Sequence, residues 1–241
     1  MLPVPRLCFC FLGMVGTDNI YCFWVYLEFF FFFTLLVLRE SKSSVMYFTF
    51  QARAGLFLIG GLALARYGLF QAGILVKLGL FPFHHWVMGV LSRNNLAVIF
   101  VLLFPAKYPL YTFVEGTVIL VRAVATMAVG AVLALGQSEV MPTLIYSRIT
   151  STGILVAGFN YNVFDLYFTL YAGSFGLVLL LLHWNSPLVP GGLLNLIGFP
   201  PLPIFFAKLA LLARVIEAVP LLVALVVVFF LSVLYYVKLL K

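Results

Sequence analysis

The sequence predicts an all-α fold, a polytopic membrane bundle of about ten transmembrane helices. Of its 241 residues, 65% are hydrophobic and 9% are charged, whereas a water-soluble domain has roughly 25% charged residues. Apolar stretches of about 20 residues, the length that crosses a bilayer as a helix, recur from one end of the chain to the other. These stretches are continuously apolar and lack the alternation typical of a membrane β-barrel. Open strands are excluded because lipid would leave their backbone groups unpaired.

Breaks in the apolar runs define the expected helices. The first run is short, and most of the others come close to the roughly 20 residues of a membrane span. The expected spans cover residues 4–16, 19–38, 45–65, 67–91, 95–113, 116–136, 140–159, 162–184, 187–214 and 218–239. Because the connections between them are short, residues 1–241 are expected to form a single transmembrane domain.

Basic residues outside the spans or near their ends predict the orientation in the membrane. On the side of the N-terminus lie Arg6, Arg39, Lys42, Arg93, Lys238 and Lys241, and on the other side lie Arg66 and Arg214. This excess predicts that both termini lie on the matrix or cytoplasmic face. Trp86 and Trp184, near span ends, are expected to act as interfacial anchors.

Other functional classes are not supported. The net charge of +7 does not indicate nucleic-acid binding, because the basic residues are scattered singly among apolar runs. The three cysteines, Cys8, Cys10 and Cys22, are expected to be apolar packing residues and lack the second ligand pair of a zinc site. His84 and His85 have no ligand partners at helical spacing, so no metal site is expected. One of these histidines is expected to cap a broken helix or to relay protons.

Seven charges lie well inside the expected spans, away from their first and last residues, where an isolated charge costs about 2.5–3.5 kcal/mol. They are Glu28, Arg53, Lys77, Lys107, Arg122, Arg148 and Lys208. Arg53 and Arg148 lie about a third of the way along their spans and are expected to reach the interface by snorkelling. Glu28, Lys77 and Lys208 lie nearer the middle, which marks them as candidate functional residues.

Two of the expected spans are interrupted beside a lysine. Lys77 is followed by Gly79 and Pro82, and proline removes a backbone donor and clashes with the preceding turn. In the other half of the chain, the segment 198–201, Gly-Phe-Pro-Pro, precedes Lys208. Two interrupted segments, one in each half, indicate a transporter built from inverted repeats with a polar path near the midplane.

A lysine beside a carboxylate in such a site suits proton movement. Burial disfavours the charged form of the lysine, and a nearby carboxylate favours it. At an effective dielectric near 20, a pair about 4 Å apart gains roughly 4 kcal/mol, which is comparable to the cost of inserting the lysine. The alternative is that these charges form structural ion pairs that hold the helices in register.

At these residues the sequence resembles NADH dehydrogenase subunit 2, the antiporter-like proton-pumping subunit of respiratory complex I. The most specific match is Lys77-Leu78-Gly79 with Pro82-Phe83-His84 and Trp86. The other matching segments are Trp24-Val25-Tyr26-Leu27-Glu28, Tyr47-Phe48-Thr49-Phe50-Gln51-Ala52, Tyr146-Ser147 and Gly198-Phe199-Pro200-Pro201 leading to Lys208. The resemblance covers most of the chain.

This resemblance implies a proton relay with an antiporter-like fold of inverted repeats. Glu28 would be the acidic partner of Lys77, Lys107 would pass protons along the central axis, and Lys208 would be the terminal lysine of the second half-channel. The subunit would be a non-redox part of the enzyme and bind no cofactor, because NADH, FMN, the iron–sulfur clusters and ubiquinone are used elsewhere in the complex. Its partners would be other membrane-arm subunits, including neighbouring antiporter-like subunits, and membrane lipids, and its location the mitochondrial inner membrane.

The sequence also departs from the family pattern. Gly89 stands where the family has a carboxylate, Arg148 replaces the second serine of its Tyr-Ser-Ser segment, and the chain is shorter than expected by about one helix. Two other functions therefore stay open. One is a structural membrane-arm subunit that pumps no protons, and the other is a cation/proton antiporter subunit of the Mrp type.

Overall fold

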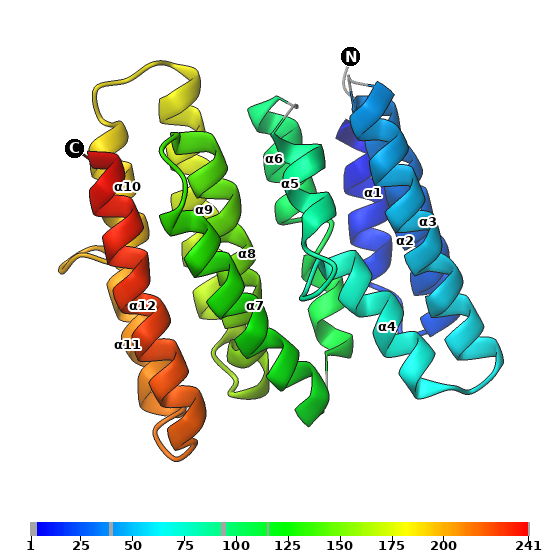
Figure 1. Ribbon diagram of the computed structural model, residues 1–241. Helices are drawn as coiled ribbons and strands as arrows, with labels where there is room; N and C mark the ends of the chain where they lie inside the picture. Colours follow the sequence, from blue (N-terminus) through cyan, green and yellow to red (C-terminus); the bar gives the residue numbers. More distant parts are fainter. Residues whose placement is uncertain (1–3, 39–40, 93–94, 115, 241) are drawn as a thin grey trace. The chain divides into compact units, whose positions relative to one another are not determined.

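The computed structural model describes residues 4–38, 41–92, 95–114 and 116–240, and within these ranges the chain is entirely helical apart from turns (Figure 1). The backbone contacts divide into two compact units, residues 1–114 and 115–241. The all-α fold expected from the sequence is confirmed. Arg39, Arg93 and Lys241, which entered the orientation argument, lie outside the described residues.

The first unit is built from six α-helices and a 3₁₀-helix in its described part. They are α1 (Val4–Val15), α2 (Ile20–Val37), α3 (Ser41–Ala63), α4 (Tyr67–Leu78), α5 (His85–Leu91), α6 (Leu96–Leu103) and η1 (Tyr108–Phe113). Asn19 begins α2 as an N-cap, because its side chain accepts a hydrogen bond from the Tyr21 N–H at 2.9 Å. The turn expected between the first two spans is therefore present.

Small residues bring α3 and α4 close together. A Cβ added at Gly61 would lie 2.5 Å from the Phe70 backbone nitrogen, and one added at Gly73 would lie 2.9 Å from the Ala54 carbonyl oxygen. Between membrane helices, close approach of this kind is a main source of attraction. The contact holds α4, which carries Lys77, against α3.

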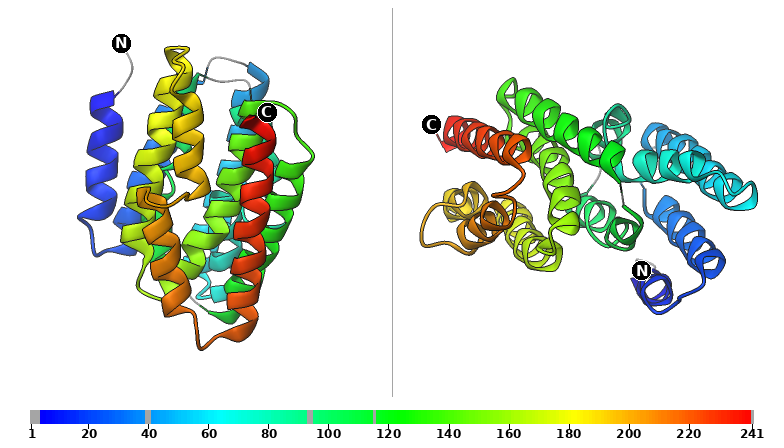
Figure 2. Two further views of the ribbon diagram at one scale, coloured as in Figure 1. Left: turned by 90° about the vertical axis from the view of Figure 1, so that its left-hand side faces the viewer. Right: turned by 90° about the horizontal axis from the view of Figure 1, so that it is seen from below.

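The second unit contains six α-helices in its described part. They are α7 (Thr117–Leu135), α8 (Val140–Asn160), α9 (Phe164–His183), α10 (Val189–Ile197), α11 (Pro203–Arg214) and α12 (Val219–Leu240). Helix α8 is the most enclosed, since α7, α9 and α12 all contact it, and α12 lies beside α7 in the views of Figure 2. Gly130 and Gly153 let α7 and α8 meet, because a Cβ at Gly153 would lie 2.6 Å from the Ala123 carbonyl oxygen.

The helices agree in position with the ten expected spans. In the described part of the chain, six unbroken helices and the segment Leu96–Phe113 are long and apolar enough to cross a membrane. Helix α1 is shorter, and three expected spans, 95–113 among them, are each divided into two helices. Two of these breaks, between α4 and α5 and between α10 and α11, were predicted. The third lies between α6 and η1, where Pro105 and Pro109 surround Lys107, and was not predicted.

Candidate functional site

A buried ion pair lies at the centre of the first unit. The Lys77 ammonium donates a hydrogen bond to Glu28 Oε1 at 2.8 Å, and the two side chains are 2% and 18% exposed. Lys77 is in the last turn of α4, and Glu28 is in the middle of α2. The structure thus brings together two of the residues that the sequence singled out.

The position of the Glu28 carboxylate depends on a glycine of α3. A Cβ added at Gly55 would lie 2.5 Å from Glu28 Oε1, closer than any real side chain tolerates. Glycine at position 55 therefore gives the carboxylate the room to lie against the α3 backbone. This residue carries no chemical signature in the sequence.

Helix α4 ends beside Lys77 with a left-handed glycine. Gly79 has φ of 71°, its N–H donates to the Val76 carbonyl at 3.1 Å, and the Leu80 N–H donates to the Leu75 carbonyl at 3.0 Å. This backbone pattern is typical of a helix that ends sharply. The Trp86 indole N–H also donates to the Val76 carbonyl, at 3.0 Å.

A second lysine binds the end of the same helix. Lys107 lies in the unpredicted break after α6, and its ammonium donates to the Leu78 carbonyl at 2.7 Å. It also lies over the Trp86 ring, 5.7 Å from the centroid, and is 3% exposed. Because a helix C-terminus carries a partial negative charge, it is a favourable place for a cation.

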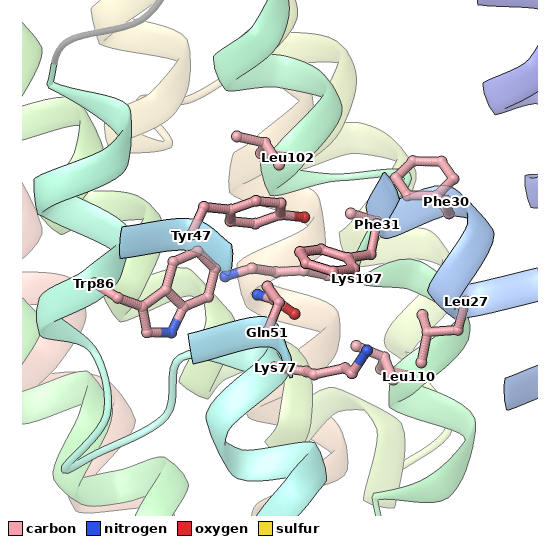
Figure 3. Close-up of a pocket in the computed structure, with 11 residues that line it drawn as sticks. Leu27, Phe30, Phe31, Tyr47, Gln51, Lys77, Trp86, Leu102, Lys107 and Leu110 are labelled. Carbon is pink, nitrogen blue, oxygen red and sulfur yellow. The ribbon is translucent and has the colours of Figure 1, made fainter. Parts of the chain in front are cut away.

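The two lysines line one small cavity with polar side chains of α3 (Figure 3). The α3 side chains are Tyr47 and Gln51, and Trp86 also lines the cavity. The volume open to the centre of a water molecule is about 20 Å³, and roughly 10–15 Å³ of this measure accommodates one water. The cavity between the two lysine side chains can therefore hold a water molecule.

Lys208 occupies a corresponding site in the second unit. Its ammonium donates to the Ile197 carbonyl at 2.6 Å and to Ser232 Oγ at 3.3 Å. Ile197 is the last residue of α10, and the next residue, Gly198, has φ of 79°. The ammonium lies 4.9 Å from the centroid of the Phe229 ring.

The two units thus use the same local arrangement. In each, a helix stops inside the unit at a left-handed glycine, and a buried lysine from another element donates to the last helical carbonyl. Lys107 and Lys208 are the lysines in this role. Only in the first unit is a further lysine, Lys77, paired with an acid among the described residues.

Some expectations for the other charges and rings were wrong. Arg148 does not reach an interface but is 0% exposed, because α8 is covered by α7, α9 and α12. Trp86 is 3% exposed and hydrogen-bonded, so it is an interior residue, whereas Trp184 is 70% exposed. His84 precedes α5 at the N-cap, but its side chain makes no capping hydrogen bond.

Several residues that shape the sites were missed at the sequence level. Gln51 and Ser232 are ordinary polar residues of apolar helices, and the acceptors on Leu78 and Ile197 are backbone carbonyls. Trp86 belonged to the most specific motif, which could have indicated an interior role. Among the described residues, no group of three or more His, Cys, Asp or Glu side chains could hold a metal ion.

Comparisons with known proteins agree with the family resemblance. No family model matches the chain. NADH-ubiquinone oxidoreductase chain 2 of Pongo pygmaeus is 28% identical over 219 residues, covering 72% of this chain and 62% of the relative. The protein of the same name from Branchiostoma floridae is 30% identical, covering 73% and 63%. NADH-quinone oxidoreductase subunit N of Nitrosomonas europaea is 27% identical, covering 70% and 45%.

Solved structures show the same fold. A chain of respiratory complex I from Thermus thermophilus superposes with a TM-score of 0.87 at 21% identity, covering 98% of this chain and 68% of that one. A chain of the Mrp complex from Dietzia sp. gives a TM-score of 0.85 at 17% identity, covering 98% and 59%. These likenesses establish that the chain shares its fold with a chain of each complex.

The sequence matches span only part of the relatives. The first three curated relatives are covered over 62%, 61% and 61% of their lengths. The broken helices, the buried lysines and the comparisons nevertheless agree with one another. The chain is a divergent relative of the NADH-ubiquinone oxidoreductase chain 2 and subunit N proteins.

Proposed function

We propose that the chain is a core membrane-arm subunit of a proton-translocating NADH:quinone oxidoreductase. Protons move through Glu28, Lys77, Lys107 and Lys208, and quinone reduction elsewhere in the complex drives them. The observation that carries this proposal is the Glu28–Lys77 pair at 2.8 Å beside the end of a broken helix. A second buried ammonium, that of Lys107, shares its cavity.

The cost of this arrangement supports a functional role. Each charge inside a membrane span costs about 2.5–3.5 kcal/mol, and apolar side chains of similar volume often replace a buried ion pair without loss of stability. Lys77 meets a carboxylate, Lys107 meets a helix C-terminus, and both side chains line a cavity that has room for water. Such a site suits a proton that is held and then released.

The remaining features follow from the same assignment. The subunit binds no redox cofactor, because NADH, FMN, the iron–sulfur clusters and ubiquinone belong to other parts of the enzyme, and it contributes to the enzyme as a non-redox subunit. Its partners are other membrane-arm subunits, including neighbouring antiporter-like ones, and membrane lipids. We place it in the mitochondrial inner membrane with both termini on the matrix side.

Replacement of Lys77 or Lys208 by methionine tests this function. Proton pumping coupled to NADH oxidation is measured in the assembled complex reconstituted into vesicles. Loss of a positioned proton-transfer group typically costs roughly 10²–10⁴-fold, so each variant should slow pumping by at least about tenfold. Lys42→Met is the matched control, because Lys42 is exposed near the start of α3. Unchanged pumping in both variants would contradict the proposal.

Two further measurements separate the alternative functions. A purely structural membrane-arm subunit would tolerate Glu28→Gln and Lys77→Met with pumping intact, whereas truncation would block assembly. The similarity of fold to a chain of an Mrp complex supports an antiporter as the other candidate. Copurification with flavin and iron–sulfur subunits would favour the oxidoreductase over the antiporter.

A further inference from the structure

Arg148 is a buried cation that the proton relay does not use. It is 0% exposed in the middle of α8. The acidic residues that the structure describes in the second unit, Glu139, Asp165 and Glu217, are all exposed. The resemblance implies an uncharged serine at this position, so the guanidinium adds a fixed positive charge to the interior of this unit.

Hydroxyl groups connect the surroundings of Arg148 with Lys208. A cavity of about 10 Å³, measured as the volume open to the centre of a water molecule, is bordered by Lys208 and by hydroxyl side chains of α8, α9 and α12. These hydroxyl residues, together called the hydroxyl cluster, are Thr150, Ser151, Tyr167, Tyr171, Ser232, Tyr235 and Tyr236.

Arg148 lies directly beside this cluster. Its guanidinium carbon is 5.4 Å from the centroid of the Tyr171 ring, which borders the cavity. The neighbouring residue Ser147 accepts a hydrogen bond from the Tyr236 hydroxyl at 2.8 Å. Ser151, one helical turn further on, also borders the cavity.

The cluster thus offers a run of hydrogen-bonding groups from Lys208 toward Arg148. At one end, Lys208 donates to Ser232 Oγ at 3.3 Å. At the other end, Tyr236 reaches Ser147 on α8. A hydroxyl group can both donate and accept a hydrogen bond, and so can a water in the cavity, so rotation of these groups lets a proton pass between neighbouring members of the cluster.

A fixed positive charge opposes the passage of a proton. Electrostatic barriers formed by an arginine are a general means of excluding protons from polar pores. At an effective dielectric near 20, a positive charge about 5–6 Å away makes protonation of a site roughly a hundredfold less favourable. A protonated water or hydroxyl near Tyr171 would meet this repulsion.

We propose that Arg148 is an electrostatic barrier that stops protons from leaking between the Lys208 cavity and the α8 side of the hydroxyl cluster. Lys208 then exchanges protons in one direction only, and the gradient built by the complex does not run back through this unit. This inference rests on the proposed function, because it takes Lys208 as a proton carrier.

Passive proton leak through the assembled complex tests the barrier. The complex is reconstituted into vesicles, a pH gradient is imposed without NADH, and its decay is followed with a pH-sensitive dye. Arg148→Met keeps the volume and removes the charge, so the leak should rise by about tenfold or more. Arg148→Lys keeps the charge and should remain tight. Arg122→Met is the matched control, since Arg122 is a half-buried arginine of the same unit.

Further variants separate this proposal from the proposed function. The double variant Arg148→Met with Lys208→Met should lose the extra leak, because the route runs through the Lys208 cavity. A tight Arg148→Met complex, or a leak that persists in the double variant, would overturn the barrier even where Lys208→Met alone still slows pumping. Normal pumping by Lys77→Met and Lys208→Met would instead overturn the proposed function.

Assembly of the variants also decides whether Arg148 is an electrostatic barrier or a residue needed only for the structure. Replacing a buried charge by an apolar side chain of similar volume is often tolerated, so the barrier role predicts an assembled Arg148→Met complex. If Arg148→Met and Arg148→Gln both failed to assemble while Arg148→Lys assembled, Arg148 would be a structural residue and the proposal would be wrong.

Discussion

At the scale of single residues, the geometry of the Glu28–Lys77 pair depends on what surrounds it. Gly55 leaves space for the carboxylate, since an added Cβ would lie 2.5 Å from Glu28 Oε1. Moving two opposite charges from about 3 Å to about 4 Å apart weakens their attraction by roughly 1.4 kcal/mol at an effective dielectric near 20. A methyl group at position 55 is therefore enough to disturb the pair.

Gly55→Ala should slow coupled proton pumping by about tenfold while the complex still assembles, because the carboxylate must move away from Lys77. Gly60→Ala on the same helix is the control, because nothing lies within 4 Å of its added Cβ. Both variants are compared for NADH-driven pumping and for the yield of assembled complex. Equal pumping in the two variants would show that the position of the carboxylate is not critical.

The charged residues of the first unit were largely predictable from sequence, but their surroundings were not. Glu28, Lys77 and Lys107 carry a cost in lipid that makes them conspicuous. Arg148 was expected at an interface because its place along the span permits snorkelling. Its burial depends instead on α9 and α12 packing over α8, a tertiary fact that no local pattern reveals.

At the scale of elements, the ends of α4 and α10 form the geometry of the two proposed sites. Both helices stop at a glycine with positive φ, Gly79 and Gly198, and both last carbonyls accept from a lysine. An L-residue with a side chain pays about 1–2 kcal/mol in the left-handed region. The backbone conformation of these two positions is therefore part of the site.

Gly198→Ala should lower the thermal stability of the complex and slow pumping. The left-handed backbone is strained by about 1–2 kcal/mol, and the new Cβ would lie 3.1 Å from Lys208 Cδ. Gly191→Ala, in α10 with open space around its Cβ, should be neutral or stabilising by up to about 1 kcal/mol. The comparison is made by thermal denaturation and by pumping assays, and a harmless Gly198→Ala would contradict the role of the helix end.

The sequence predicted two helix breaks and missed the third for a physical reason. Gly79 is followed by Pro82, and Gly198 is followed by two prolines. Each break thus combines a glycine, which readily adopts a positive φ, with proline, which has no backbone N–H to donate. The break at Lys107 has Pro105 and Pro109 but no glycine, and the chain continues there as a 3₁₀-helix. Because residues 95–113 are apolar on both sides of Lys107, hydropathy predicted a single span there.

At the scale of the whole molecule, the ten spans expected from the sequence would alternate in direction and give each connection a definite side of the membrane. In the first unit, the starts of α1 and α3 share one side, where Arg6 and Lys42 lie, and the connection at Asp18 lies on the other. The positions of the spans were predictable because residues that face lipid must be apolar, so hydropathy marks them directly. The division into two compact units could not be read from hydropathy.

Cysteine labelling should confirm the orientation. In mitochondrial membranes from a background in which the exposed Cys8 and Cys22 are both replaced by serine, Lys42→Cys should react with a membrane-impermeant maleimide from the matrix side only, and Asp18→Cys from the opposite side only. Both positions are exposed, so a lack of access does not confuse the result. The reverse pattern of labelling would place the termini on the intermembrane side.

The acceptors of Lys107 and Lys208 determine which nearby positions can be substituted in evolution. Both ammonium groups donate to main-chain oxygens, at Leu78 and Ile197, and every amino acid provides such an oxygen. Mutations at positions 78 and 197 can therefore change the side chain without deleting the acceptor, whereas each donor must stay lysine. Rapidly evolving genomes should vary at the two acceptor positions without compensating changes at the lysines.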